Sequence, residues 1–114
     1  HNQMQLLELA CEIGMQLARG QLKSNPAQLF ALVRDALNAM EADEVSIHCS
    51  PMDADYLIGR QPELEQGGGQ AFKVRVIADP SLEPGDFRTE SKLGSIDGRL
   101  SARLAEVRRA LEGE

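Results

Sequence analysis

The chain has 114 residues, of which 42% are apolar and 26% are charged, and its formal net charge is −6. This length suits a single globular domain over residues 1–114, and the apolar content excludes bulk disorder. The acidic balance argues against a binder of nucleic acid or of anionic membranes, because clustered Lys and Arg drive phosphate binding, and no apolar run reaches transmembrane length.

The first predicted helix covers residues 2–19, with Gly20 as its C-cap. Its apolar stripe consists of Leu6, Ala10, Ile13 and Leu17, with Leu7, Gly14 and Ala18 beside them. The stripe is wide for a surface helix, so either the helix packs from more than one side or residues 2–20 end an upstream coiled-coil stalk. Because the helical pattern already runs at Met4, we expect the natural N-terminus to lie upstream of His1.

A second helix is predicted from Pro26 to about Met40. Asn25 is suited to its N-cap, Pro26 fits the first helical position, and Gln28 stands where a capping box would place it. The apolar face of this helix consists of Phe30, Val33, Leu37 and Met40. An acidic loop over residues 41–44 follows the helix.

Residues 45–49 alternate between apolar and polar side chains, which predicts a short strand. The inward side chains of this strand are Val45, Ile47 and Cys49. Ser50 as N-cap and Pro51 at the first helical position begin a third helix, which runs to about Gly59. Residues 61–69 are predicted to form a loop, and its three glycines are no phosphate cradle because a strand follows them.

The clearest strand pattern covers residues 72–78, where apolar side chains alternate with basic ones. The apolar members are Phe72, Val74 and Val76. Asp79-Pro80 ends this strand, because proline has no N–H for the sheet and the Asp side chain can cap a turn. Pro84-Gly85 supplies a second turn, and residues 87–91 form the return strand of a hairpin.

The last predicted helix begins near Asp97, which is its expected N-cap. Its apolar stripe consists of Ile96, Leu100, Leu104, Val107 and Leu111. The predicted order is therefore helix, helix, strand, helix, strand, strand, helix. A strand–helix–strand unit followed by a hairpin predicts an α+β fold, in which a small mixed sheet of three to four strands packs against helices.

The sequence contains little that is arranged for chemistry. His48 and Cys49 are neighbours on a strand, so they point to opposite faces and do not converge on a metal or a substrate. Cys11 and Cys49 form no disulfide framework, and we expect reduced, buried thiols in a cytoplasmic setting. The acidic residues that could surround a cation are Asp53, Asp55, Asp79, Asp86, Glu90 and Asp97. Their spacing shows no convergence, so we expect no metal, no cofactor and no enzyme.

A surface for another protein remains as the functional candidate. The candidate partner-binding residues are Leu64, Leu82, Pro84 and Leu93, which lie in or beside polar turns and loops. Leu82 and Leu93 are the better candidates for exposed anchors, because turn tips rarely bury deeply. The alternative is that each of these side chains packs locally under its own turn.

The chain also resembles a known family from Leu6 to Leu111, and most specifically from Asp79 to Leu104. The residues that carry the resemblance are Asp79-Pro80-x-Leu82-x-Pro84-Gly85-Asp86, then Glu90-Ser91, Gly94-x-Ile96-Asp97, Leu100 and Arg103-Leu104. This pattern resembles the C-terminal domain of the flagellar assembly protein FliH and of its injectisome relatives SctL, YscL and HrpE. It is more distantly similar to the peripheral-stalk E subunit of rotary ATPases. The family has Cys more often than Phe at Phe87, and a small residue other than Gly at Gly98.

The resemblance implies a non-catalytic stator that negatively regulates the type III export ATPase in flagellar or injectisome protein export. It implies docking of the N-terminal region of that ATPase and a homodimer formed through an upstream coiled coil. A region upstream of His1 would attach the protein to a C-ring or sorting-platform protein, in the cytoplasm at the inner membrane. Two alternatives stay open, namely an E-type stalk subunit of a rotary ATPase and a small metal-dependent enzyme that uses the acidic residues.

Overall fold

A computed structural model describes residues 2–40, 42–66 and 73–113. Its helices are α1 (Asn2–Ser24), α2 (Pro26–Asn38), α3 (Pro51–Ile58), α4 (Gln61–Glu65) and α5 (Leu100–Glu112). Its strands are β1 (Glu44–Cys49), β2 (Lys73–Ala78), β3 (Phe87–Ser91) and β4 (Gly94–Asp97). The α+β class and the order of the predicted elements are confirmed, and α4 and β4 are added to them.

The four strands form one mixed sheet in the order β2-β1-β3-β4. Strand β1 lies parallel to β2 and antiparallel to β3, and β3 lies antiparallel to β4. The predicted hairpin between residues 72–78 and 87–91 is therefore wrong, because β1 lies between these two strands. The connection after β2 crosses the end of β1, where the Asp79 N–H donates to the Cys49 carbonyl at 2.7 Å, and the hairpin is made by β3 and β4 instead.

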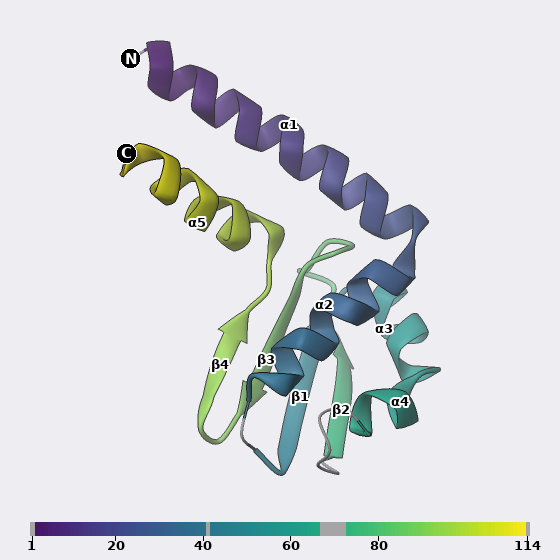
Figure 1. Cartoon of the computed structure of the whole chain (residues 1–114). Coiled ribbons are helices and arrows are strands. Elements are labelled where there is room, and N and C mark those ends of the chain that lie inside the picture. Colours follow the sequence, from purple (N-terminus) through teal and green to yellow (C-terminus); the bar gives the residue numbers. More distant parts are fainter. Residues whose placement is uncertain (1, 41, 67–72, 114) are drawn as a thin grey trace.

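The core lies between one face of the sheet and helices α2 and α3 (Figure 1). The sheet contributes Val45, Ile47, Cys49, Val74 and Phe87, and the two helices contribute Leu29, Val33, Leu37, Ala54 and Leu57. The inward side chains predicted for β1 are confirmed, since Val45, Ile47 and Cys49 are all buried. The same alternation turns the polar side chains of β1 toward the opposite face of the sheet.

Helices α1 and α5 extend side by side beyond the sheet, and we call this pair the arm (Figure 1). Both chain ends lie at the far end of the arm. Arg108 of α5 pairs with Glu8 of α1 at 3.2 Å, and the molecule is 49 Å along its longest axis. Gly20 does not end α1, which continues to Ser24. The reason is tertiary, because Leu22 of that last turn is buried in the core and this burial outweighs the low helix propensity of glycine.

Three predicted helix starts have different outcomes. Ser50 caps α3 as predicted, since its hydroxyl accepts the Asp53 N–H at 3.2 Å. Asn25 holds the N-cap position of α2, but its side chain makes no cap hydrogen bond. Asp97 is not the N-cap of α5, because it ends β4 and its carboxylate binds Arg99, the residue at the cap position.

The loop predicted over residues 61–69 is partly wrong, because Gln61–Glu65 form α4. Pro62 occupies the first turn of this helix, where its missing N–H costs no intrahelical bond. The three glycines and Phe72 lie outside the described residues.

Phe87 and Gly98 form one close contact, which connects the two departures from the family pattern. A Cβ atom at Gly98 would stand 2.3–2.5 Å from three ring atoms of Phe87, too close for any real side chain. The Gly98 N–H also donates to the Phe87 carbonyl at 2.9 Å, so the backbone cannot easily move away. The large ring at one position therefore requires glycine at the other.

We expect Gly98→Ala to lower the free energy of unfolding by about 1–3 kcal/mol, because the added methyl overpacks the Phe87 ring. In the double variant Phe87→Cys/Gly98→Ala, the alanine should fit into space that the ring has left. The combined loss should then be smaller than the sum of the single losses by about 1 kcal/mol or more. Urea denaturation of the four proteins measures this coupling. Gly20→Ala is the control and should stabilise the domain, since Gly20 is helical and has open space around it. If the losses at positions 87 and 98 simply added, the close contact between Phe87 and Gly98 would not be what requires glycine.

Candidate docking site

Residues 79–86 connect β2 to β3, and we call this segment the elbow turn. The Asp79 carboxylate caps it as predicted, because Oδ1 accepts the Ser81 hydroxyl at 2.6 Å and the Ser81 N–H at 2.9 Å. These hydrogen bonds to the charged form lower the pKa of Asp79. Gly85 adopts φ +91°, a conformation that side-chain-bearing residues rarely take. Pro84-Gly85 thus forms the tight turn that the sequence predicts.

Two buried carboxylates fix the elbow turn to helices on either side of it. Asp53 of α3 accepts the Gly85 N–H on its Oδ2 at 2.8 Å. Asp86, inside the turn, accepts the Leu100 N–H on its Oδ1 at 2.9 Å. Leu100 begins α5, so the Asp86 carboxylate satisfies one free N–H of that helix and lies at the positive end of its dipole.

Arg19 fixes α1 to the same turn. Its Nη1 donates to the Pro84 carbonyl at 2.6 Å and lies 3.3 Å from Asp86 Oδ2, and its Nη2 lies 3.3 Å from Glu83 Oε2. A Cβ atom at Gly85 would stand 2.9 Å from Leu22 Cδ1, so α1 also presses directly on the backbone of the turn. Both helices of the arm are therefore held where they leave the body by one short segment.

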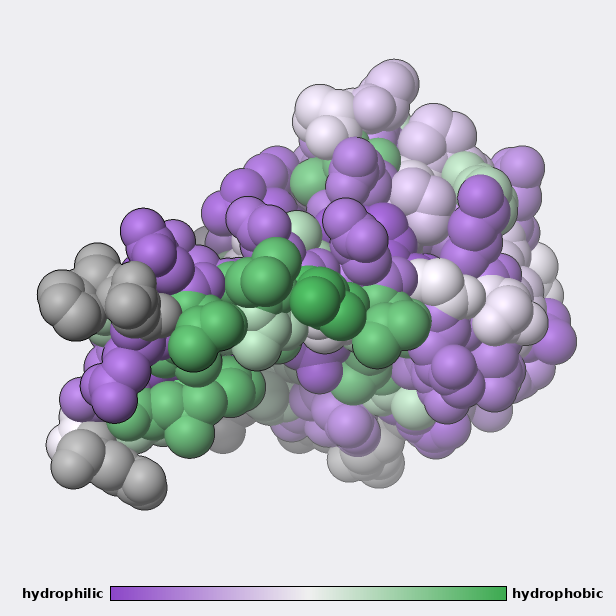
Figure 2. Space-filling model, turned by 90° about the horizontal axis from the view of Figure 1, so that it is seen from above, coloured by the Kyte–Doolittle hydropathy of each residue, from purple (hydrophilic) through white to green (hydrophobic). Residues whose placement is uncertain are grey.

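The arm carries a long apolar surface that faces solvent. Its members are Met4, Leu6, Leu9, Ile13 and Leu17 of α1 with Leu111 of α5, and we call them the arm surface. Leu6 is 66% exposed and Leu17 is 70% exposed. Figure 2 shows apolar residues gathered along the arm, with hydrophilic residues covering most of the body. A continuous exposed apolar surface of this kind marks an interaction site.

An apolar hollow lies where the arm joins the body, between α1, α2 and α5, and we call it the arm groove. Its volume is about 360 Å³. Its lining residues are Ala18, Gln21, Leu22, Gln28, Leu32, Leu100, Arg103, Leu104 and Val107. Leu22 and Leu100 also contact Gly85, so the arm groove adjoins the elbow turn.

The structure separates the four predicted partner-binding residues. Leu64 is fully buried, so its side chain is not a surface anchor, because α4 turns it into the core instead of leaving it in a loop. Leu82 and Pro84 are half-buried on the elbow turn. Leu93 is 76% exposed at the tip of the β3–β4 hairpin. The elbow turn precedes β3 and the hairpin tip follows it, so these two turns lie at opposite ends of that strand.

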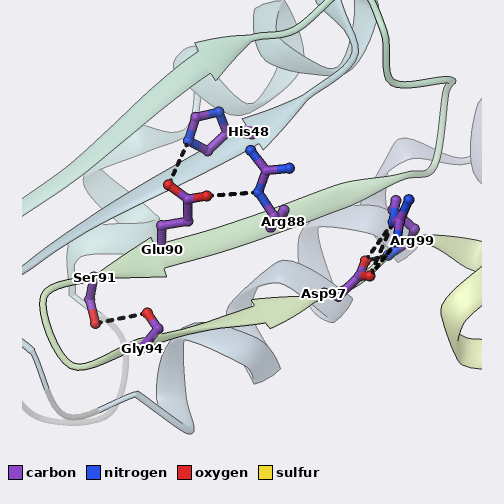
Figure 3. Close-up of polar contacts among 7 residues, drawn as sticks. All are labelled: His48, Arg88, Glu90, Ser91, Gly94, Asp97 and Arg99. Carbon is purple, nitrogen blue, oxygen red and sulfur yellow. Dashed lines mark hydrogen bonds and ion pairs between the residues drawn. The ribbon is translucent and has the colours of Figure 1, made fainter.

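The open face of the sheet carries a small polar cluster (Figure 3). His48 Nε2 lies 3.4 Å from Glu90 Oε2, and Arg88 Nε lies 2.8 Å from Glu90 Oε1. Cys49 is buried in the core, so the two neighbours point to opposite faces as predicted. Asp97 pairs with Arg99 at 2.7 Å, and hydrogen bonding to that guanidinium lowers the pKa of Asp97.

Five of the six acidic residues that the sequence offered for a cation have hydrogen-bond or ion-pair partners of their own, and Asp55 is exposed. Asp53 and Asp86 hold the elbow turn, Asp79 caps it, and Asp97 binds Arg99. In the part of the chain that the structure describes, no group of three or more His, Cys, Asp or Glu side chains could hold a metal ion. Across the same residues, no helix is both long enough and apolar enough to cross a bilayer.

We expect Asp53→Ala to lower the free energy of unfolding by about 1–3 kcal/mol, because it leaves the buried Gly85 N–H without an acceptor. Urea denaturation measures the loss. Asp55→Ala on the same helix is the matched control, since Asp55 is exposed and its removal should change stability by less than about 0.5 kcal/mol. Equal effects of the two substitutions would show that the bond from Asp53 to the elbow turn does not hold the fold.

The buried Cys49 thiol should resist alkylation in the folded protein. Burial, and secondarily the nearby Asp53 charge, raise the pKa of Cys49 from 9.0 to about 12, so the reactive thiolate stays scarce even at alkaline pH. Cys11 is only half-buried on α1 and should be alkylated first. Mass spectrometry after iodoacetamide treatment at pH 8 and at pH 9 should find Cys49 unmodified in buffer and modified in urea. Modification of Cys49 at the rate of Cys11 in buffer would contradict the buried position.

Comparison with known proteins agrees with this geometry. A family model described as "Flagellar assembly protein FliH" matches residues 1–107, which include α1, the elbow turn, the whole sheet and the first part of α5. No match was found among curated proteins.

Proposed function

The chain belongs to the FliH family of flagellar assembly proteins, and from this premise we propose that it is a non-catalytic stator and negative regulator of the type III export ATPase. In this proposal the domain docks the N-terminal region of the ATPase on the cytoplasmic side of the inner membrane. A region upstream of His1 attaches the domain to a C-ring protein or, in an injectisome, to a sorting-platform protein. The observation that carries the proposal is the apolar surface that the arm leaves exposed.

A second copy of the chain is the proposed occupant of the arm surface. Leu6, Ile13 and Leu17 follow one side of α1, which is the pattern of a helix that pairs with another helix. The opposite side of α1 already packs against α5, so the stripe serves no contact within the described chain. A homodimer along α1 would cover it and would continue the coiled-coil stalk proposed for residues 2–20.

We propose that the ATPase docks on the arm groove and the elbow turn, which together we call the ATPase seat. The groove offers an apolar floor between three helices, with Arg103, Gln21 and Gln28 as polar lining residues. This geometry suits an amphipathic helix whose apolar side chains enter the groove. Leu82 and Pro84 adjoin the groove through Gly85 and are half-buried, so a partner can cover them together with the groove. Leu93 lies too far along β3 to take part in the same contact.

The family match favours the export ATPase over a rotary ATPase as the motor. A subunit of the E type would use a similar docking body, and co-purification with each ATPase separates the two. The acidic residues give no support to the metal-dependent alternative, because Asp53, Asp79 and Asp97 each form hydrogen bonds that shape the fold.

Titration calorimetry of the domain with the purified ATPase tests the docking seat. Leu82→Glu on the elbow turn and Val107→Glu in the arm groove should each weaken binding about tenfold or more, because they place a charge where an apolar contact is buried. Leu93→Glu is the matched control, since the same change at the far end of β3 should leave the affinity unchanged. Circular dichroism confirms that each variant is folded.

Ile13→Glu separates the two proposed contacts. Ile13 lies on the arm surface outside the arm groove. The substitution should therefore lower self-association in sedimentation equilibrium and leave the heat of ATPase binding per domain unchanged. If Leu93→Glu weakened ATPase binding while Leu82→Glu and Val107→Glu did not, and all three variants were folded, the ATPase would dock elsewhere than on the ATPase seat.

A further inference from the structure

The two edge strands of the sheet, β2 and β4, differ in how far their outward main-chain N–H and C=O groups are covered. At the β2 edge, α4 covers the outward main-chain groups of Val74. Gln61 Nε2 donates to the Val74 carbonyl at 2.8 Å, and the Val74 N–H donates to Glu65 Oε2 at 2.9 Å. An uncovered edge strand invites another strand to pair with it, so the side chains of α4 close this edge.

Within the described residues, the β4 edge has no such cover. β4 pairs with β3 through Thr89↔Ile96, and the Gly98 N–H donates to the Phe87 carbonyl at 2.9 Å. In an antiparallel pair, alternate residues turn their main-chain groups to the partner strand, so Ser95 and Asp97 turn theirs away from β3. Among the residues that the structure describes, no hydrogen bond reaches the N–H or C=O groups of Ser95 and Asp97. β4 is also the outermost strand on the side away from α3 and α4 (Figure 1).

A hollow lined by both polar and apolar residues accompanies this open edge. It lies between the end of α2 and the β3–β4 hairpin and has a volume of about 340 Å³. Its lining residues are Ala39, Met40, Ser91, Leu93, Gly94, Ser95 and Ile96. Leu93 stands at its rim and is 76% exposed. An open strand edge beside a hollow with apolar members such as Met40 and Ile96 is an arrangement that proteins use to bind an extended peptide, since the main chain pairs and alternate side chains enter the hollow.

The charges around the hollow favour a basic partner. Met40 and Leu93 also line a larger neighbouring hollow, whose charged lining residues are Asp43, Glu44 and Lys92. Two carboxylates against one ammonium leave this neighbourhood negative, and the whole chain carries −6. A second copy of the chain would bring another −6 to the same edge, so this occupant is disfavoured electrostatically.

We propose that β4 accepts an extended segment of a different protein as a fifth strand. The main chain of that segment pairs with Ser95 and Asp97, one of its apolar side chains enters the hollow beside Met40 and Leu93, and a basic residue beyond it faces Asp43 and Glu44. The hollow lies at the opposite end of β3 from the elbow turn, and none of its lining residues belongs to the arm surface or to the arm groove. A second partner can therefore bind the body while the arm is occupied.

A designed peptide serves as the probe. In it valine and threonine alternate, two lysines stand at each end, and a fluorescein label reports binding by anisotropy. A second peptide carries glutamates in place of the lysines. The lysine peptide should bind, and its binding should protect the amide protons of Ser95 and Asp97 from hydrogen exchange. The glutamate peptide should bind at least about threefold more weakly, because it meets Asp43 and Glu44 with like charge.

Ser95→Pro tests the pairing without breaking the sheet. Its missing N–H is one that faces away from β3, so the fold should survive, as proline is tolerated on edge strands. Affinity for the lysine peptide should fall about tenfold, and Ser95→Ala, which keeps the N–H, should bind normally. Leu93→Ala, which removes apolar surface at the hollow without changing the charge, should also weaken binding, and Leu17→Ala on the arm surface should not.

The proposal is overturned by any of three results. One is unchanged affinity in a folded Ser95→Pro variant, and another is peptide-induced protection on α1 or α5 rather than on β4. The third is absence of binding by the lysine peptide at about millimolar concentration. These outcomes leave the ATPase seat untouched, because that seat is tested by Leu82→Glu and Val107→Glu.

Discussion

The buried carboxylates of Asp53 and Asp86 determine how the two parts of this molecule are joined. Each is almost inaccessible to water and each accepts a main-chain N–H, one from Gly85 and one from Leu100. A buried carboxylate without such donors would be strongly destabilising, so displacing the turn would leave Asp53 without the Gly85 N–H and would separate Asp86 from the Leu100 N–H. Arg19 adds α1 to the same arrangement through the Pro84 carbonyl and Asp86. The family pattern Pro84-Gly85-Asp86 therefore describes a joint: proline and glycine shape the turn, and the aspartate starts the last helix.

The body and the arm bury their apolar side chains in different ways. The body closes a core between the sheet and helices α2 and α3, where Val33, Ile47 and Leu57 are fully buried. The arm consists of two helices, and each covers only one side of the other, so its outer side chains remain in water. Apolar surface of this extent is costly to leave exposed, at about 25 cal/mol for each Å². Its presence on one element, beside a body whose surface is polar, is the reason that we propose a second chain as its cover.

The sequence predicted best those elements whose signals are local. The alternation of residues 45–49 gave β1 its inward side chains, and Ser50-Pro51 located the start of α3, because strand period and helix capping act within a few residues. The short elements α4 and β4 were missed, since five and four residues carry little periodicity. Gly20 and Asp97 were misassigned because burial of Leu22 and the Asp86–Leu100 bond outweigh local preference. No local signal joins Asp53 to Gly85, 32 residues further on, so the candidate site could be predicted only as a turn and not as a joint.

In the proposed stator role the domain must transmit force, and a polar joint suits this requirement. An apolar contact between arm and body would resist separation but would allow sliding, because dispersion and hydrophobic burial depend weakly on direction. The hydrogen bonds from Gly85 to Asp53 and from Leu100 to Asp86, with the Arg19 guanidinium on the Pro84 carbonyl, each have a preferred angle as well as a preferred length. Together they fix the direction of α1 and α5 relative to the sheet. In the proposed assembly, a force on a partner bound in the arm groove would thus reach the body through these directional bonds. The apolar side chains of the groove would then determine the affinity for that partner.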